Sequence, residues 1–309
     1  MILEIIIFLT ALAILAKSAD SAIDQVVLIA RHLNISDFTA GFILIAVSTS
    51  LPELLIGVFS SASKTTGIGV GNVLGANIAN LLLILGLIIF LHKIEIRGKK
   101  LAENAQVMVF ITFIPIAMLL SGQLGLVEGI ALIALFVTYC VFAFKEKIAL
   151  DITPKDHFKS FRTFFIFALS IALLLLSANI LVSSTSKIAA GFGIPASLIA
   201  VTVVSLGTTL PELASSLSAL KKKRFEIAIG TLVGSVITNS TLVLGAAAIV
   251  NPLSYNKEVI LTAVFFLVLA QLLAFSTLTI QGKLNHKIGL TLLSAYALFI
   301  LIEIGIISI

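Results

Sequence analysis

The chain is poor in charged residues, in cysteine and in tryptophan. Asp, Glu, Lys and Arg make up 11% of its 309 residues, whereas a soluble domain carries about a quarter. The single cysteine, Cys140, lies in an apolar run, so a disulfide within the chain is excluded. Tryptophan is absent, so any aromatic belt at a membrane surface must rely on Tyr and Phe. These shortages argue against a soluble domain and against a fold held by internal disulfides.

Long apolar runs are what the chain has instead. Hydrophobic residues make up 59% of it, and its mean hydropathy is +1.19. A helix needs roughly 20 apolar residues to cross a bilayer. The runs predict ten transmembrane helices, at approximately 2–30, 37–63, 67–91, 102–121, 125–144, 161–187, 195–220, 226–250, 257–277 and 287–308. We therefore expect an all-α integral membrane protein.

Basic residues are distributed unevenly among the predicted loops. With ten spans, one side of the membrane collects Arg31, Lys93, Arg97, Lys99, Lys100, Lys145, Lys147, Lys155, Lys159, Arg162, Lys221, Lys222, Lys223, Arg224, Lys283 and Lys287. The other side has only Lys64, Lys187 and Lys257. Basic residues are retained in the cytoplasm, so the rich side is predicted to be inside. This pattern predicts a multi-pass protein of the cell membrane with both termini outside, and it argues against a nucleic-acid partner.

An internal repeat relates the two halves of the chain. The segment Ser48 to Glu53 recurs as Gly207 to Glu212, 159 positions later. The residues that recur at this offset are Thr49, Leu51, Pro52, Glu53, Leu54, Gly71, Gly75, Ile78, Asn80, Leu83, Leu85 and Gly86. Five spans per half is an odd number, so the second half must enter the membrane with the opposite orientation. We expect two inverted five-helix repeats, at 1–144 and 161–309, joined by a cytoplasmic linker at 145–160.

The repeated segment carries a buried acid directly after a proline. Pro52 and Pro211 lack an N–H and should break their helices, freeing carbonyls around Ala46 and Ser205. Glu53 and Glu212 would then begin the following half-helices, and an acid at membrane depth marks a functional site by default. The neighbouring hydroxyls belong to Thr49, Ser50, Thr208 and Thr209. Carboxylate, carbonyl and hydroxyl oxygens suit Ca²⁺ or Na⁺ rather than soft metals.

The next span in each half supplies a second row of polar and small residues. The pairs Gly71 and Gly75, and Gly230 and Gly234, are spaced for close helix packing. Asn80, Asn239 and Ser235 lie on the same approximate helix face and would approach the two acids. Taken alone, a proline kink, a glycine pair or a buried amide is more often structural, and the repetition is what favours a cation site. In the first span, Lys17, Asp20 and Asp24 are interpreted as structural pairs on one helix face.

With these residues the chain resembles the Ca²⁺/cation antiporter superfamily, and in particular prokaryotic Na⁺/Ca²⁺ exchangers. The resemblance covers essentially the whole chain and rests on two repeated motifs, G-[TS]-[TS]-x-P-E and G-[NT]-x-x-G-[SA]-x-x-x-[ND]. It implies that Glu53 and Glu212 coordinate Ca²⁺, while Thr49 and Thr208 with the carbonyls near Ala46 and Ser205 help to ligate Ca²⁺ or Na⁺. It also implies that Asn80, Asn239 and Ser235 complete the site, and that the first and sixth spans slide to alternate access.

The chain departs from the family pattern at four positions. Ser48 stands where Gly is usual, Thr231 where Asn is common, and Ala76 where Ser is frequent. Asn239 stands where Na⁺/Ca²⁺ exchangers often have Asp, which leaves two full negative charges at the site. Two carboxylates balance one Ca²⁺ or two Na⁺, and a third Na⁺ would leave the loaded site at +1. The stoichiometry is therefore open.

The expected function is antiport of Na⁺ against Ca²⁺ by alternating access at a site built on Glu53 and Glu212. The alternative is exchange of H⁺ against Ca²⁺ or another divalent cation, because carboxylates can also carry protons. A channel is disfavoured by the inverted halves. A membrane enzyme is disfavoured because His32, His92, His157 and His286 all fall in loops or at span ends. We expect no cofactor and no obligate protein partner; the expected partners are the transported ions and the lipid bilayer.

Overall fold

The computed structural model describes residues 2–64, 66–92, 95–96, 100–120, 123–145, 160–191, 205–254, 257–279 and 282–303. Within these ranges the regular secondary structure is helical except for four strands of two residues each. The chain divides into two compact units, each assembled from both sequence halves. The first unit comprises Met1–Thr49 and Tyr139–Gly234, and the second comprises Ser50–Thr138 and Ser235–Ile309. The two units are defined by contacts between residues, whereas the predicted halves are defined by the sequence repeat. The units therefore do not test the boundaries of the halves, which stay a prediction. The linker predicted at 145–160 lies outside the described residues over 146–159.

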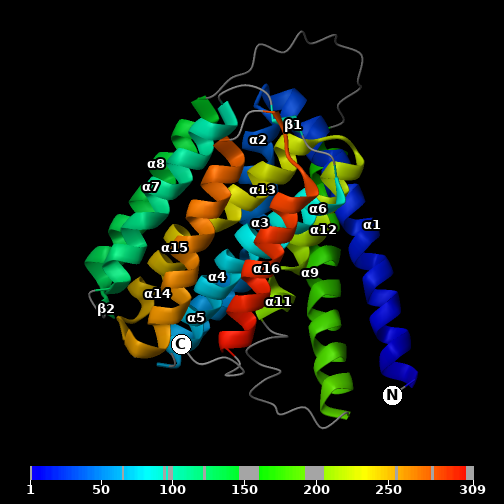
Figure 1. Cartoon of the computed structure of the whole chain (residues 1–309). Helices are drawn as coiled ribbons and strands as arrows, with labels where there is room; N and C mark the ends of the chain where they lie inside the picture. The colour runs from blue at the N-terminus through cyan, green and yellow to red at the C-terminus, as the bar shows by residue number, and fades with distance from the viewer. Residues whose placement is uncertain are drawn as a thin grey trace. The chain divides into compact units, whose positions relative to one another are not determined.

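The first unit is built around two long helices that lie side by side. Its elements are α1 (Ile2–Leu33), α2 (Asp37–Ala40), the π-helical segment η1 (Gly41–Ala46), α3 (Val47–Thr49), α9 (Ser160–Gly191), α11 (Ser205–Thr208), α12 (Leu210–Lys221) and most of α13 (Phe225–Thr238). Figure 1 shows α1 in blue beside α9 in green, and the two helices contact each other extensively. The Ser170 hydroxyl donates to the Ser21 hydroxyl between them at 2.7 Å. The helix α1 also packs against α12.

The second unit contains the remaining helices and all four strands. Its elements are α4 (Leu51–Ala62), α5 (Thr66–Ile78), η2 (Ala79–Ile84), α6 (Leu85–Leu91), β1 (Glu95–Ile96), α7 (Lys100–Leu120), β2 (Gln123–Leu124), most of α8 (Leu126–Lys145), η4 (Asn239–Val243), α14 (Leu244–Val250), β3 (Leu253–Ser254), α15 (Lys257–Thr279), β4 (Gly282–Lys283) and α16 (His286–Glu303). The helix α15 packs on α7, and α16 packs on α6. Antiparallel pairs join β1 to β4 and β2 to β3.

The element bounds repeat with the offset found in the sequence. Leu51–Ala62 recurs as Leu210–Lys221, 159 positions later, and the stretch from Thr66 to Leu91 recurs as Phe225 to Val250. The strands follow the same logic, because the first strand of each half pairs with the second strand of the other half. The internal repetition inferred from residue identities is therefore also a repetition of secondary structure.

Most of the predicted membrane spans have a counterpart in the structure. Within the described residues, seven helices are long and apolar enough to cross a membrane, or eight if Asp37–Thr49 with Leu51–Ala62 forms one broken span. Of the ten predicted spans, only the first and the seventh are outside this set. The first coincides with the 32-residue helix α1, and part of the seventh, 195–204, lies outside the described residues. The count of ten stays a prediction.

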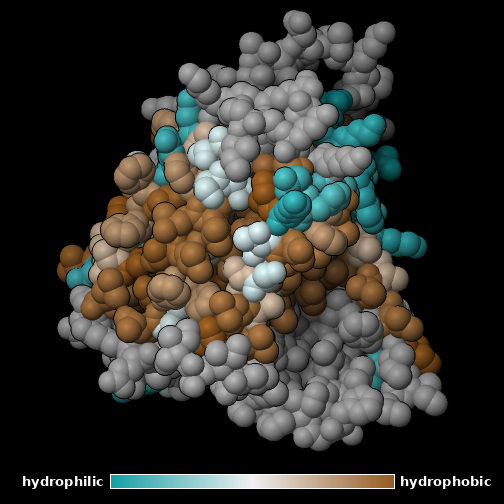
Figure 2. All heavy atoms as spheres, viewed as in Figure 1, coloured by the Kyte–Doolittle hydropathy of each residue, from teal (hydrophilic) through white to brown (hydrophobic). Residues whose placement is uncertain are grey.

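Apolar side chains cover the outer surface of the second unit. Figure 2 shows them in brown across α15 and the adjoining α7. The large exposed residues on these two helices include Phe110, Phe113, Leu261, Phe265 and Leu272. A continuous apolar surface of this extent would be a liability in water and marks contact with a membrane.

Two glycines allow α13 to pack closely in the first unit. A Cβ added to Gly230 would lie 2.2 Å from the Phe38 carbonyl oxygen, and one added to Gly234 would lie 2.8 Å from the Ala46 Cβ. The close packing predicted for this pair is therefore confirmed. The positions equivalent to Phe38 and Ala46 are 197, which lies outside the described residues, and 205, whose side chain is not described, so the prediction for Gly71 and Gly75 stays one.

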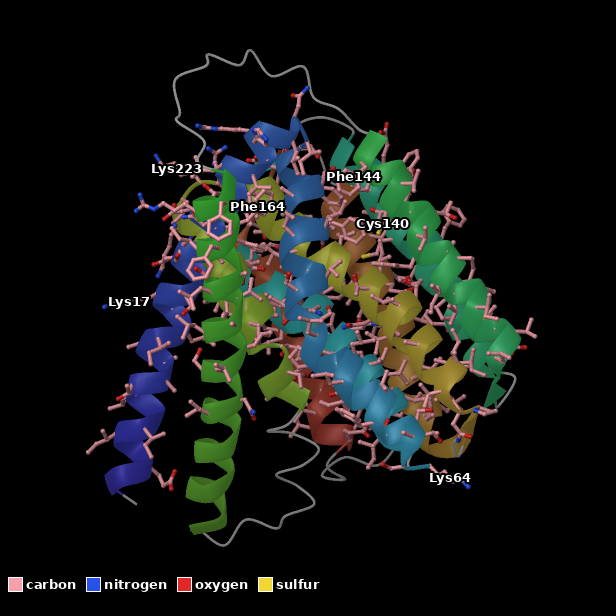
Figure 3. The ribbon with its side chains drawn as sticks, turned by 180° about the vertical axis from the view of Figure 1, so that it is seen from behind. Lys17, Lys64, Cys140, Phe144, Phe164 and Lys223 are labelled. Atoms are coloured by element: carbon pink, nitrogen blue, oxygen red, sulfur yellow. The ribbon has the colours of Figure 1, made fainter. Side chains whose placement is uncertain are left out.

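Asp20 and Asp24 of α1 bond to residues at the end of α12 rather than within their own helix. The Ser218 hydroxyl donates to Asp20 Oδ1 at 2.6 Å. Lys222 Nζ donates to the Asp20 carbonyl and lies 2.7 Å from Asp24 Oδ1. Lys17 points outward from α1, away from α9 (Figure 3). The structural role predicted for these acids holds, but the prediction of pairs on one helix face is wrong because α12 brings a base within reach.

Removing the hydroxyl of Ser218 should weaken the contact between α1 and α12. Ser218 is buried and donates to a side-chain carboxyl oxygen, so Ser218→Ala is expected to cost about 1.5 kcal/mol of unfolding free energy. Thermal unfolding of the purified protein in detergent, followed by circular dichroism, measures the loss. The matched control is Ser276→Ala, because the exposed Ser276 hydroxyl bonds only within its own helix. Equal stability of the two variants would contradict the assignment.

Candidate ion-binding site

Both predicted helix breaks are present, at equivalent positions of the repeat. The helix α3 ends at Thr49 and α4 begins at Leu51, while α11 ends at Thr208 and α12 begins at Leu210. In each case the proline occupies the first turn of the new helix. In the first turn of a helix, the N–H that proline lacks would have no acceptor within that helix, so its absence does not destabilise the new helix. The carbonyl four residues before the proline, however, loses its usual N–H donor.

Hydroxyl groups next to the breaks bond back to the preceding turn. Thr49 Oγ1 donates to the carbonyls of Ile45 at 3.1 Å and Ala46 at 3.3 Å. Thr209 Oγ1 donates to the Leu206 carbonyl at 2.9 Å. A hydroxyl that donates its hydrogen bond to a backbone carbonyl keeps its oxygen lone pairs for another partner. Such an oxygen can ligate a cation.

The two acids sit at the start of the half-helices, as the sequence predicts. Glu53 lies in the first turn of α4 and Glu212 in the first turn of α12. Both side chains are 0% exposed. The positive end of a helix dipole favours a carboxylate in the first turn. Complete burial is nevertheless expensive for a carboxylate unless a positive charge or several donors compensate it.

The predicted site residues are divided between the two units. The first unit holds Ala46, Thr49, Ser205, Thr208, Thr209 and Glu212, and the second holds Ser50, Glu53, Asn80, Ser235 and Asn239. Every one of them whose side chain the structure describes is buried. Within the first unit α12 contacts η1, the segment that ends at Ala46. Within the second unit α4 packs against α5 and against η4, and Asn239 is the first residue of η4.

Each predicted asparagine lies in a π-helical turn. Asn80 is the second residue of η2, and Asn239 is the first residue of η4. A π-helical turn inserts a residue into the helical ladder and shifts the direction of the side chains, and such turns are frequent at functional sites. The third π-helical segment, η1, ends at Ala46, and its repeat equivalent lies largely outside the described residues. Local backbone distortion thus coincides with the predicted ligands.

Several buried polar atoms of the second unit have no hydrogen-bond partner among the described residues. Among the predicted site residues they are both amide atoms of Asn80, Oδ1 of Asn239 and the hydroxyl oxygen of Ser50. Buried polar groups in proteins are nearly always paired with protein, water or an ion. Three of these four atoms can act as oxygen or hydroxyl ligands to a hard cation, so the donor set fits Na⁺ or Ca²⁺. Within the described ranges, no group of three His, Cys, Asp or Glu side chains is placed to hold a metal ion.

Sequence reasoning missed one buried polar residue that contacts the predicted site, Asn77. Its amide Nδ2 donates to the Ser240 hydroxyl at 2.8 Å, and its Oδ1 accepts from Asn239 Nδ2 at 3.2 Å. The repeat could not reveal this residue, because the equivalent position is Val236. The available signal was its position three residues before Asn80, on the same helix face.

Comparison with known proteins identifies the relatives of this chain. A family model described as sodium/calcium exchanger protein matches residues 3–145 and 162–305. A putative antiporter CaxA from Alkalimonas amylolytica is 30% identical and covers 82% of each chain. The sodium/calcium exchanger MaX1 from Methanosarcina acetivorans is 26% identical, covering 96% of this chain and 97% of its own. A solved structure of the sodium-calcium exchanger NCX_Mj, soaked with Na⁺ and Ca²⁺, is 27% identical with a TM-score of 0.85, covering 96% and 97% of the two chains.

Proposed function

This chain belongs to the sodium/calcium exchanger protein family, and from that premise we propose that it is a secondary active antiporter that exchanges Na⁺ for Ca²⁺ across the cell membrane. The observation that carries the proposal is the pair of fully buried acids, Glu53 and Glu212, each in the first turn after an interrupted helix. Two relatives that are named as sodium/calcium exchangers span nearly the whole chain, which supports the same activity.

In the proposed mechanism Na⁺ and Ca²⁺ occupy one site in turn. Glu53 and Glu212 supply the negative charge, and the hydroxyls and carbonyls beside the helix breaks supply neutral oxygens. The two carboxylates neutralise one Ca²⁺ or two Na⁺, so either load crosses hydrocarbon at little electrostatic cost. Without a bound cation the site keeps the negative charge of two carboxylates and should move poorly, which suppresses leak. Competition for one site then couples the two fluxes without a separate device.

The proposed architecture is ten spans in two inverted repeats, 1–144 and 161–309, with a cytoplasmic linker at 145–160. The repeated element bounds and the reciprocal strand pairs support it. An even total of ten spans places both termini on the same side, which the basic loops predict to be outside, and an odd number of spans per half turns the second half over in the membrane. The two acids would thereby lie on oppositely oriented halves near the bilayer midplane, where inverted-repeat transporters bind their ions.

A flux assay with two imposed gradients tests the proposed coupling. Proteoliposomes loaded with Na⁺ and diluted into Na⁺-free buffer are expected to take up ⁴⁵Ca²⁺, while empty liposomes are not. A pH gradient without Na⁺ is expected to drive no uptake beyond the empty-liposome level. Uptake driven by pH alone would instead favour H⁺/Ca²⁺ exchange, for which Asn239 in place of a third acid is the supporting observation. Uptake that needs no counter-ion would indicate a channel.

A further inference from the structure

Asn77 is a fully buried polar residue of the second unit to which the proposed function assigns no role. It lies near the end of α5, three residues before Asn80. Both of its amide atoms are used: Nδ2 donates to Ser240 and Oδ1 accepts from Asn239. The three side chains form a chain of hydrogen bonds that links α5 to η4, and all three are at most 3% exposed.

This chain of hydrogen bonds fixes which end of the Asn239 amide is free. Nδ2 of Asn239 is bonded to Asn77, whereas its Oδ1 is buried and has no hydrogen-bond partner among the described residues. An amide oxygen is a good ligand for a hard cation, while an amide NH₂ presents two donor hydrogens that repel one. A rotated amide would therefore replace a ligand with a repulsive group.

We propose that Asn77 is a positioning residue that holds the Asn239 amide with its oxygen turned toward the transported cation. Ser240 anchors Asn77 by accepting from Nδ2, so that Oδ1 of Asn77 is left to accept from Asn239. The proposal rests on the proposed function, because it assumes that Asn239 is a ligand of the transported ion.

The role is specific to one half of the chain. The repeat equivalent of Asn77 is Val236, and the equivalent of Ser240 is Leu81, so the other half cannot form the same hydrogen bonds. In agreement, neither amide atom of Asn80 has a hydrogen-bond partner among the described residues. Position 239 holds an amide rather than a carboxylate. A carboxylate has two equivalent oxygens and needs no such orientation, whereas an amide does.

A comparison of two backgrounds tests the proposal. Asn77→Leu removes both hydrogen bonds at similar volume, and we expect it to raise the apparent dissociation constant for ⁴⁵Ca²⁺ of the purified protein by about tenfold. In an Asn239→Asp background the same substitution is expected to change that constant by less than about twofold, because either carboxylate oxygen can face the ion. Size-exclusion chromatography checks that the substituted protein is folded in both backgrounds.

The other outcomes overturn the proposal. An equal loss of affinity in both backgrounds would make Asn77 a structural residue, and no loss in either would leave it without a role in binding. If Asn77→Leu does not fold, Ser240→Ala removes only the anchor and should weaken Ca²⁺ binding about threefold, again only with Asn at position 239. A wild-type protein that binds no Ca²⁺ would overturn the proposed function together with this inference. Wild-type binding without the dependence on background would overturn the inference alone.

Discussion

Replacing Glu53 or Glu212 with Gln is expected to reduce Na⁺-gradient-driven ⁴⁵Ca²⁺ uptake by about 100-fold, because loss of one partner of a buried charge pair costs about 3 kcal/mol. Gln keeps the shape and one oxygen of the side chain, so the loss reports the charge. With a single carboxylate left, a Ca²⁺-loaded site would carry a net charge of +1 at membrane depth. Either substitution by itself should be sufficient to reduce uptake, because the two acids occupy equivalent positions of the repeat.

The matched control for these substitutions is Glu103→Gln. Glu103 is an exposed acid in the first turn of α7, and its loss should leave uptake unchanged. Reconstituted protein is compared at equal amounts, after size-exclusion chromatography shows that each variant is folded. Uptake at the wild-type rate by either variant would remove that acid from the site.

The substitution Gly230→Ala is expected to cause the largest loss of stability. An added Cβ would lie 2.2 Å from the Phe38 carbonyl oxygen, and the matching position on the facing segment, Gly41, would clash with the Ile227 carbonyl oxygen at 2.3 Å. The two backbones therefore approach through a pair of glycines, and neither can shift away easily. Overpacking of this kind costs about 1–3 kcal/mol or more, and thermal unfolding in detergent measures it.

Gly67→Ala provides the opposite expectation. Gly67 is an exposed residue of α5, and a Cβ added there meets nothing within 4 Å. Alanine is the better helix former by about 1 kcal/mol, so this variant should be as stable as the wild type or more stable. If both substitutions had the same effect on the unfolding midpoint, close packing at Gly230 would not explain the glycine.

The repeat made the helix breaks and the burial of the acids predictable from sequence. A proline that recurs with the same register fixes where two helices must restart, and the structure restarts them at Leu51 and Leu210. An acid that follows the proline then falls in a first turn by covalent connection alone. These features depend on neighbours in the chain, which is why sequence reasoning reaches them.

Features that depend on contacts between distant segments could not be predicted in the same way. The hydrogen bond between Asn77 and Asn239 joins residues 162 positions apart and has no counterpart in the other half. The salt bridge between Asp24 and Lys222 likewise depends on how α1 packs against the end of α12. Repetition reveals what the halves share, and these contacts belong to what they do not share.

In the proposed mechanism, Na⁺ and Ca²⁺ compete for one site that contains Glu53 and Glu212. Equilibrium binding of ⁴⁵Ca²⁺ to the purified protein at increasing Na⁺ tests it most directly. The apparent dissociation constant for Ca²⁺ is predicted to rise with Na⁺ without reaching a plateau, and the number of sites should stay constant. A constant that levels off, or that does not respond to Na⁺, would place the two ions at separate sites and contradict the account.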